Sequence, residues 1–251
     1  MLRIASEKDL TCIQQNIKKE RKYRKEVIVC GGTGCLSSGN DRILENLKKK
    51  IKDLGKEEEI RIVKTGCVGF CEKGPIVKIL PDNTFYAEVT PDDVDEIINK
   101  DLIENGIVEK LLYKNPLTKE TVRDSDEIDF YKKQKKIALR NCGVIDPEDI
   151  NDYFLYDGYK ALDKAVKMTR QEVVNIIKDS GLRGRGGGGF STGLKWQFAL
   201  DNESDEKYVV CNADEGDPGA FMDRSVLEGD PHRVIEGMAV CGYAIGADEV
   251  Y

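Results

Sequence analysis

The chain of 251 residues lacks several features that would point to particular classes of protein. It contains no run of about 18 apolar residues, the length that a membrane-spanning helix needs. Its first residues lack the basic segment followed by an apolar stretch that marks a secretory signal peptide. Acidic residues outnumber basic ones by 46 to 39, and the net charge of −7 argues against a nucleic-acid partner. The sequence therefore predicts a cytoplasmic protein with no direct membrane span.

Cysteine is comparatively abundant, with eight in the chain. In a reducing compartment these are expected to be metal ligands or buried thiols rather than disulfides. Four form close pairs among glycines: Cys30 and Cys35 as C-x4-C, and Cys67 and Cys71 as C-x3-C. Four thiolates from two loops suit a [2Fe–2S] cluster or zinc, although zinc fingers more often use C-x2-C pairs. The alternative is that the four cysteines are buried in the core and bind no metal.

The hydrophobic pattern divides the chain into two α/β parts. A polar, partly helical segment is expected over 1–26, and a small domain of order βαββα over 27–112. Its helices are expected over 41–54, where the apolar spacing is helical, and from Thr90, which precedes a proline and an acidic first turn. Residues 113–129 are charged and irregular, and are interpreted as a linker. A second domain is expected over 130–251.

The second part contains GLRGRGGGGFSTGLKW, residues 181–196, which follows a helix capped by Thr169 and ended by Gly181. Gly184, Gly186 and Gly189 satisfy G-x-G-x-x-G, but the loop follows a helix rather than a strand, so the Rossmann interpretation fails. A Walker A loop also fails, because Leu194 separates Lys195 from the last glycine. Bare backbone N–H groups still favour a bound phosphate, with a flexible linker as the alternative.

A second motif, CNADEGDPGAFMDR over 211–224, follows an expected strand. Ligands of open α/β sheets bind beyond the carboxyl ends of strands, so polar residues here are candidates for a binding site. A solvated acidic turn is the alternative. A helix from about Asp230 and a final short strand would complete a βαβ unit. His232, the one histidine, is interpreted as structural.

The first cysteine region resembles the thioredoxin-like [2Fe–2S] ferredoxin domain of respiratory complex I and related hydrogenases. The residues that carry this resemblance are CGGTGCLSSG and TGCVGFCEKGPIV. It implies that Cys30, Cys35, Cys67 and Cys71 hold the cluster.

The glycine loop and the acidic motif together resemble the FMN- and NADH-binding flavoprotein subunit of complex I. They resemble still more the matching subunit of NAD(P)-linked hydrogenases, electron-bifurcating ones among them. The resemblance implies an α/β fold in which the thioredoxin-like domain precedes the N-terminal part of a Rossmann-like FMN domain. It assigns to FMN the residues Gly184, Arg185, Gly186, Gly187, Gly188, Lys195, Asn212, Asp214 and Glu215. It assigns Phe190, Phe198 and Asp217 to NAD(P)H, and Asp217 stands where complex I members carry Glu.

The function that follows is electron transfer between NAD(P)H, FMN and iron–sulfur clusters inside a multisubunit hydrogenase or complex I-like dehydrogenase. No side chain is assigned a catalytic role, because the flavin accepts hydride directly. Partners would be other redox subunits, a ferredoxin or a hydrogenase catalytic subunit. Since the family continues beyond Tyr251 to a domain with a [4Fe–4S] cluster, the chain is expected to be truncated. The alternatives are a [2Fe–2S] electron carrier whose flavin half only docks a partner, and a zinc-stabilised binding module.

Overall fold

A computed structural model describes residues 7–251, which fall into two compact units. The sheet unit, as we call it, comprises Ile17–Asp152 and Arg224–Asp230, and the helical unit comprises the residues up to Asn16, Tyr153–Asp223 and Pro231–Tyr251. Of the polar segment expected over 1–26, residues 1–6 lie outside the described part, and helix α1 (Glu7–Glu20) follows them. Between residues 7 and 251, no helix is both long and apolar enough to cross a membrane.

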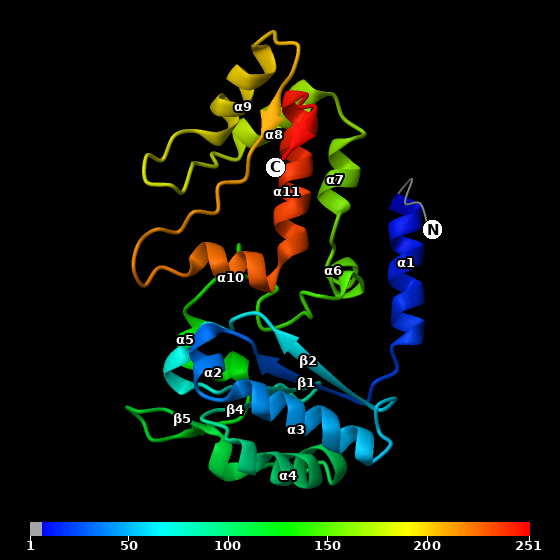
Figure 1. Cartoon of the computed structure of the whole chain (residues 1–251), viewed down its shortest axis with the longest axis vertical. Coiled ribbons are helices and arrows are strands. Elements are labelled where there is room, and N and C mark those ends of the chain that lie inside the picture. Colours follow the sequence, from blue (N-terminus) through cyan, green and yellow to red (C-terminus); the bar gives the residue numbers. More distant parts are fainter. Residues whose placement is uncertain (1–6) are drawn as a thin grey trace. The chain divides into compact units, whose positions relative to one another are not determined.

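A mixed four-stranded sheet in the order β2-β1-β3-β4 forms the centre of the sheet unit. Its strands are β1 (Lys25–Cys30), β2 (Ile60–Thr65), β3 (Val77–Leu80) and β4 (Thr84–Tyr86). β1 and β2 are parallel, and the other two pairings are antiparallel. Helix α3 (Asn40–Asp53) makes the crossover that a parallel pair requires and lies along the sheet (Figure 1). The βαββ order expected from the sequence is confirmed.

The main core of this unit lies between the sheet and α3. Ile43, Leu47 and Ile51 recur at helical spacing on one face of α3 and pack with Val27 and Val29 of β1. Each of these five side chains is at most 1% exposed, so the pattern read from the sequence corresponds to a buried face.

The second helix of the unit begins as the sequence predicts and continues differently. Thr90 and Asp93 form a capping box, and Pro91 is the first helical residue. The helix then passes through the turn η2 (Pro91–Asp93) and α4 (Val94–Glu96) into a π-helical segment, η3 (Ile97–Ile103). A π turn leaves little trace in residue periodicity, so the sequence pattern indicated only a helix.

The segment expected to be a linker carries short elements. They are η4 (Glu109–Leu111), the antiparallel pair β5 (Tyr113–Lys114) and β6 (Thr121–Val122), η5 (Ser125–Glu127) and α5 (Asp129–Lys132). Phe130 stacks on Phe70 with 4.7 Å between ring centroids, and the sheet unit extends to Asp152. The domain ranges expected from the sequence, 27–112 and 130–251, stay predictions.

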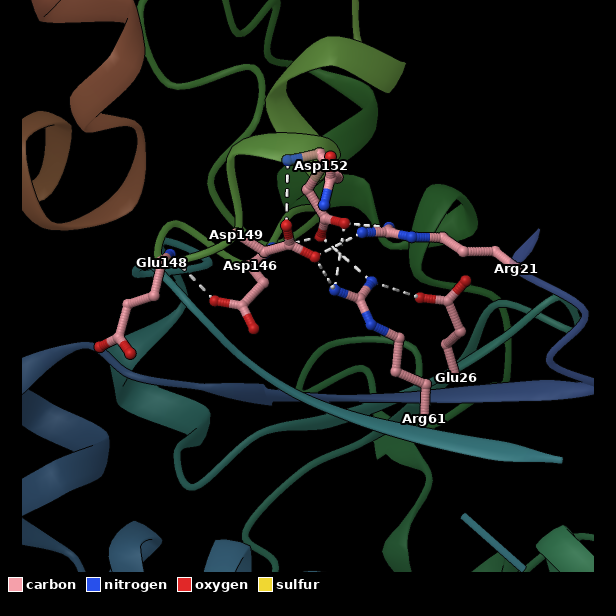
Figure 2. Close-up of polar contacts among 8 residues, drawn as sticks. Arg21, Glu26, Arg61, Asp146, Glu148, Asp149 and Asp152 are labelled. Atoms are coloured by element: carbon pink, nitrogen blue, oxygen red, sulfur yellow. Dashed lines mark hydrogen bonds and ion pairs between the residues drawn. The ribbon is translucent and has the colours of Figure 1, made fainter. Parts of the chain in front are cut away.

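A partly buried ion-pair cluster around Asp152 stabilises the end of the sheet unit (Figure 2). The Asp152 carboxylate is 3% exposed and accepts from both Arg21 and Arg61, while Arg61 Nη1 donates to Glu26 at 3.2 Å. Asp152 also accepts the backbone N–H of Asp146 at 2.7 Å. Burial alone would lower the pKa of Arg61, but its carboxylate partners raise it. Mutual pairing satisfies charges that would otherwise be costly to bury, so the cluster holds this stretch in place.

The helical unit surrounds α11 (Pro231–Ile245), which contacts α7 (Lys160–Ala165), α8 (Arg170–Asp179) and α9 (Thr192–Asp201) (Figure 1). Two further helices are α6 (Ile150–Leu155) and α10 (Met222–Gly229). β7 (Tyr208–Val209) and β8 (Glu249–Val250) form a parallel pair on either side of α11 in the chain. The expected βαβ arrangement is therefore present.

Buried polar contacts order the helical unit. Glu236 of α11 accepts the Tyr153 hydroxyl and the backbone N–H groups of Tyr159 and Leu162, the latter two at 2.9 and 3.0 Å. His232 Nδ1 lies 2.9 Å from the Tyr159 hydroxyl. These contacts are consistent with the structural role expected for His232.

Candidate functional site

The two cysteine pairs lie at one edge of the sheet. Cys30 is the last residue of β1, and Cys67 follows the end of β2. Cys35 lies in the short helix α2 (Thr33–Ser37), and Cys71 begins the turn η1 (Cys71–Lys73). Since β1 and β2 are adjacent and parallel, their carboxyl ends bring both loops together.

The four thiols form a chain of neighbours in space, in the order Cys35, Cys30, Cys67 and Cys71. The free thiol of Cys30 is hydrogen-bonded to the thiols of Cys35 and Cys67, and Cys67 Sγ lies 3.8 Å from Cys71 Sγ. The bond with Cys35, followed by burial, raises the pKa of Cys30 to about 11, while the same bond lowers that of Cys35. The pKa of Cys67 is raised first by Cys30, and that of Cys71 by burial. Crowded thiols resist joint ionisation, and a bound metal centre removes this resistance.

Glycines provide the space in which these sulfurs meet. A Cβ added at Gly32 would lie 2.9 Å from Cys67 Sγ, and one added at Gly74 would lie 2.7 Å from Cys35 Sγ. At Gly34 the added atom would lie 3.3 Å from Cys71 Cβ. Each glycine faces a cysteine of another turn, so a side chain at either Gly32 or Gly74 would push the thiols apart.

Backbone N–H groups also point at the sulfurs. The N–H of Gly69 donates to Cys67 Sγ at 3.4 Å, and those of Val68 and Ile76 bond to Cys30 and Cys35. Gly69 has φ +88°, a conformation that favours glycine. Four thiolates with amide donors are the environment that a [2Fe–2S] cluster takes, so the residues present fit that group. No three metal-binding side chains among residues 7–251 are arranged to hold a single ion.

The sequence missed two contributors to this site, Tyr131 and Lys136. The Tyr131 hydroxyl and Lys136 Nζ both donate to the Val68 carbonyl, at 3.3 and 3.1 Å. Both residues come from the stretch after the expected linker, more than 60 residues from Val68 in sequence. No motif in the sequence marks them.

The glycine loop of the helical unit, residues 182–192, is closed at its base by two backbone hydrogen bonds and is open between them. We call this loop the strap. The N–H of Gly184 donates to Phe190 O at 2.8 Å, and that of Thr192 donates to Leu182 O at 2.9 Å. Between these bonds, a Cβ at Gly186, Gly187 or Gly188 would meet no atom within 4 Å. Gly187 has φ +104°. The strap therefore exposes bare backbone to solvent, with the exposed side chain of Arg185 beside it.

The strap leads directly into a helix N-terminus. Ser191 is the N-cap of α9 and accepts the N–H of Leu194, and Lys195 lies in the first turn with its side chain exposed. Free N–H groups at a helix start, with a cation beside them, form a suitable site for a phosphate. Phe190 and Phe198 flank the region, with ring centroids 6.5 Å apart and both rings exposed.

The acidic loop follows β7, as expected. Asn212 accepts the N–H of Asp214 at 3.0 Å, which shapes the loop, and Glu215 accepts the N–H of Asp223 at 3.0 Å. Asn212, Asp214 and Asp217 are exposed. The strap and the acidic loop belong to the helical unit and the four paired cysteines to the sheet unit. The roles of these residues toward FMN and NAD(P)H stay predictions.

Comparison with known proteins finds matches to both regions. Residues 13–101 match the family model of the thioredoxin-like [2Fe–2S] ferredoxin, and residues 177–251 match that of the Nuo51 FMN-binding domain. The chain is 66% identical over 116 residues to the NADP-reducing hydrogenase subunit HndC of Solidesulfovibrio fructosivorans, which is 46% of this chain and 24% of that protein. It is 50% identical over 116 residues to an NADH-quinone oxidoreductase subunit of Rhizobium meliloti, which is 46% of this chain and 28% of that one.

Among solved structures, a thioredoxin-like [2Fe–2S] ferredoxin from Aquifex aeolicus is 33% identical, with a TM-score of 0.33. The match covers 36% of this chain and 89% of the ferredoxin. The present chain spans about a quarter of the length of the two curated relatives, 24% and 28%.

Proposed function

Since residues 13–101 belong to the thioredoxin-like [2Fe–2S] ferredoxins and residues 177–251 to the Nuo51 FMN-binding domains, we propose a function in electron transfer. The chain would be part of the flavoprotein subunit of an NAD(P)-linked hydrogenase or a complex I-like dehydrogenase. The observation that carries this proposal is the presence on one chain of a glycine-lined four-cysteine site and an open glycine strap at a helix start.

Cys30, Cys35, Cys67 and Cys71 would hold the [2Fe–2S] cluster. Their thiols already contact one another, and Gly32 and Gly74 leave the space that their sulfurs need. The backbone N–H groups of Val68, Gly69 and Ile76 would stabilise thiolate charge, because a hydrogen bond to the charged form favours it.

The strap residues Gly184, Gly186, Gly187 and Gly188, together with Arg185 and Lys195, would bind the phosphate of FMN. The exposed backbone at Gly186, Gly187 and Gly188 and the N-terminus of α9 support this assignment, whereas the N–H of Gly184 is already bonded to Phe190 O. Asn212, Asp214 and Glu215 would orient the rest of the flavin by hydrogen bonds. Phe190, Phe198 and Asp217 would contact the nicotinamide nucleotide, for which the two exposed rings offer stacking surfaces.

FMN supplies hydride exchange with a nicotinamide nucleotide and single-electron exchange with iron–sulfur clusters. The protein's own part is therefore to bind and orient FMN and to tune its reduction potential. Neither His232 nor any other side chain is needed as a general base. The His232 ring is instead engaged with Tyr159 in the helical unit.

The names of the two curated relatives describe a hydrogenase subunit and a quinone oxidoreductase subunit. By analogy, we expect other redox subunits as partners, with a ferredoxin or a hydrogenase catalytic subunit among the candidates. We also propose a reducing, cytoplasmic location, in which cysteines without disulfides are expected.

Anaerobic purification of the chain, followed by its absorbance spectrum and assays for iron, sulfide and FMN, tests the proposal. Iron and sulfide in equal amounts, with bound FMN and reduction of the cluster by NADH or NADPH, are the expected results. Iron and sulfide without FMN binding would favour the electron-carrier alternative. Zinc in place of iron would contradict the redox function.

A further inference from the structure

The peptide unit that joins Val68 to Gly69 has partners at both of its ends. Its N–H, on Gly69, donates to Cys67 Sγ at 3.4 Å. Its C=O, on Val68, accepts Lys136 Nζ at 3.1 Å and the Tyr131 hydroxyl at 3.3 Å. One rigid amide therefore connects an ammonium and a phenol to a cysteine sulfur of the candidate cluster site.

Such an arrangement strengthens the bond to sulfur. Hydrogen bonds in a chain polarise one another, so donors at the carbonyl make the N–H of the same amide a better donor. A charged donor has the larger effect, because charge-assisted hydrogen bonds are stronger than neutral ones. Hydrogen bonds to the sulfurs are among the features that set the reduction potential of an iron–sulfur cluster.

The two donors are held in place by their surroundings. Lys136 Nζ lies 4.8 Å from the centroid of the Tyr131 ring, so the two side chains form a cation–π pair. The Tyr131 ring packs edge-on against Phe70 and Phe85, with centroids 5.9 and 6.0 Å apart. Val68 is 7% exposed. Lys135, the residue before Lys136, is exposed.

We propose that Lys136 and Tyr131 are positioning residues that raise the reduction potential of the [2Fe–2S] cluster through the Val68–Gly69 peptide. The inference rests on the proposed function, since it requires a cluster on the four cysteines. Reduction adds negative charge to the cluster, and a nearby cation with a polarised N–H donor stabilises the reduced form more than the oxidised form. Removing either donor should lower the potential.

The test is a redox titration followed by electron paramagnetic resonance, on the full chain reconstituted anaerobically with iron and sulfide. Lys136→Gln removes the charge, Lys136→Arg keeps it, and Tyr131→Phe removes only the hydroxyl. Lys135→Gln is the control, because it deletes an equal charge from an exposed lysine of the same segment. Iron and sulfide are measured first in every variant.

For Lys136→Gln we expect the ratio of reduced to oxidised cluster at a fixed potential to fall about three- to tenfold, which is about 30–60 mV for a one-electron couple. Tyr131→Phe should shift it the same way by less, and Lys136→Arg should restore it. The same potential in Lys136→Gln as in the wild type, or an equal fall in Lys135→Gln, would overturn the inference.

If Lys136→Gln does not retain the cluster, Tyr131→Phe decides: a lowered potential supports the inference and an unchanged one overturns it. Absence of iron and sulfide from the wild-type chain would instead contradict the proposed function, and the inference with it. If the wild-type chain holds the cluster and its potential is the same in Lys136→Gln and Tyr131→Phe, the inference is overturned and the proposed function is unaffected.

Discussion

Gly74 lies against Cys35 so closely that a Cβ on Gly74 would come within 2.7 Å of the Cys35 sulfur. The backbone of Gly74 has φ −74° and ψ 159°, an extended conformation open to any residue. The glycine is therefore required by the neighbouring thiol and not by its own dihedral angles. This makes position 74 a selective probe of the cysteine site.

Gly74→Ala should weaken retention of the cluster, because the added methyl displaces one of its four ligands. We expect about a tenfold loss of cluster affinity, the low end of what a misplaced supporting residue costs a metal site. Iron and sulfide per chain, measured after repeated gel filtration, give the result. Gly55→Ala is the control: its φ of +63° strains the backbone, but no atom lies within 4 Å of the added Cβ. Equal cluster loss in both variants would contradict the prediction.

Lys195→Ala should weaken FMN binding if Lys195 meets the phosphate. A hydrogen bond to a charged group contributes about 1.5–3 kcal/mol, which corresponds to about a 10- to 150-fold increase in Kd. Quenching of flavin fluorescence during titration with FMN measures this. Lys164→Ala removes a similarly exposed lysine from α7 of the same unit and should leave the Kd unchanged. A Kd for Lys195→Ala within twofold of the wild type would remove Lys195 from the site.

Asp93 should stabilise the helix at 91–103 in a pH-dependent way. Burial alone would raise the pKa of Asp93, but bonds from Lys110 and Thr90 outweigh it and hold that pKa below its ordinary value. The unfolded chain then takes up the proton first as the pH falls. The stabilisation is thus present above the ordinary carboxyl pKa, about 3.9, and is lost as the pH drops through the lower folded value.

Asp93→Ala should accordingly lower the stability of this helix by about 1 kcal/mol at pH 7, with a smaller difference from the wild type near pH 3. Hydrogen exchange of the peptide covering 94–103, compared between variant and wild type at each pH, reports it. Asp92→Ala, at an exposed neighbour in the same turn, should have a much smaller effect. A difference that does not shrink at low pH would argue against the carboxylate bonds as its cause.

Glu236→Ala should destabilise the helical unit by about 3 kcal/mol, since one buried carboxylate satisfies two backbone N–H groups and the Tyr153 hydroxyl. The unfolding midpoint in urea, followed by the fluorescence of Trp196 in the same unit, measures the change. Glu203→Ala, at an exposed position, should leave the midpoint in place. Similar midpoints for the two variants would mean that the Glu236 bonds contribute little.

The sequence predicted those elements whose signal is local. The alternation and helical spacing of 27–65 gave β1, α3 and β2, and the capping residues Thr90 and Thr169 were both correct. The cysteine pairs were visible because their spacing is short. The packing of Phe130 on Phe70 was not visible, because it joins distant parts of the chain and leaves no periodicity. Lys136 was missed for the same reason, since its partner carbonyl is 68 residues away.

The segment Arg224–Asp230 has a consequence for how such proteins can be cut and recombined. It belongs to the sheet unit, although the chain on both sides of it belongs to the helical unit. Asn141 donates to Asp230 at 2.8 Å, and a Cβ on Gly66 would lie 2.4 Å from Gly229 Cα. A gene fragment that stops at Asp152 would leave this piece behind. Any replacement of the residues after Asp152 would therefore have to include a segment that takes this place in the sheet unit.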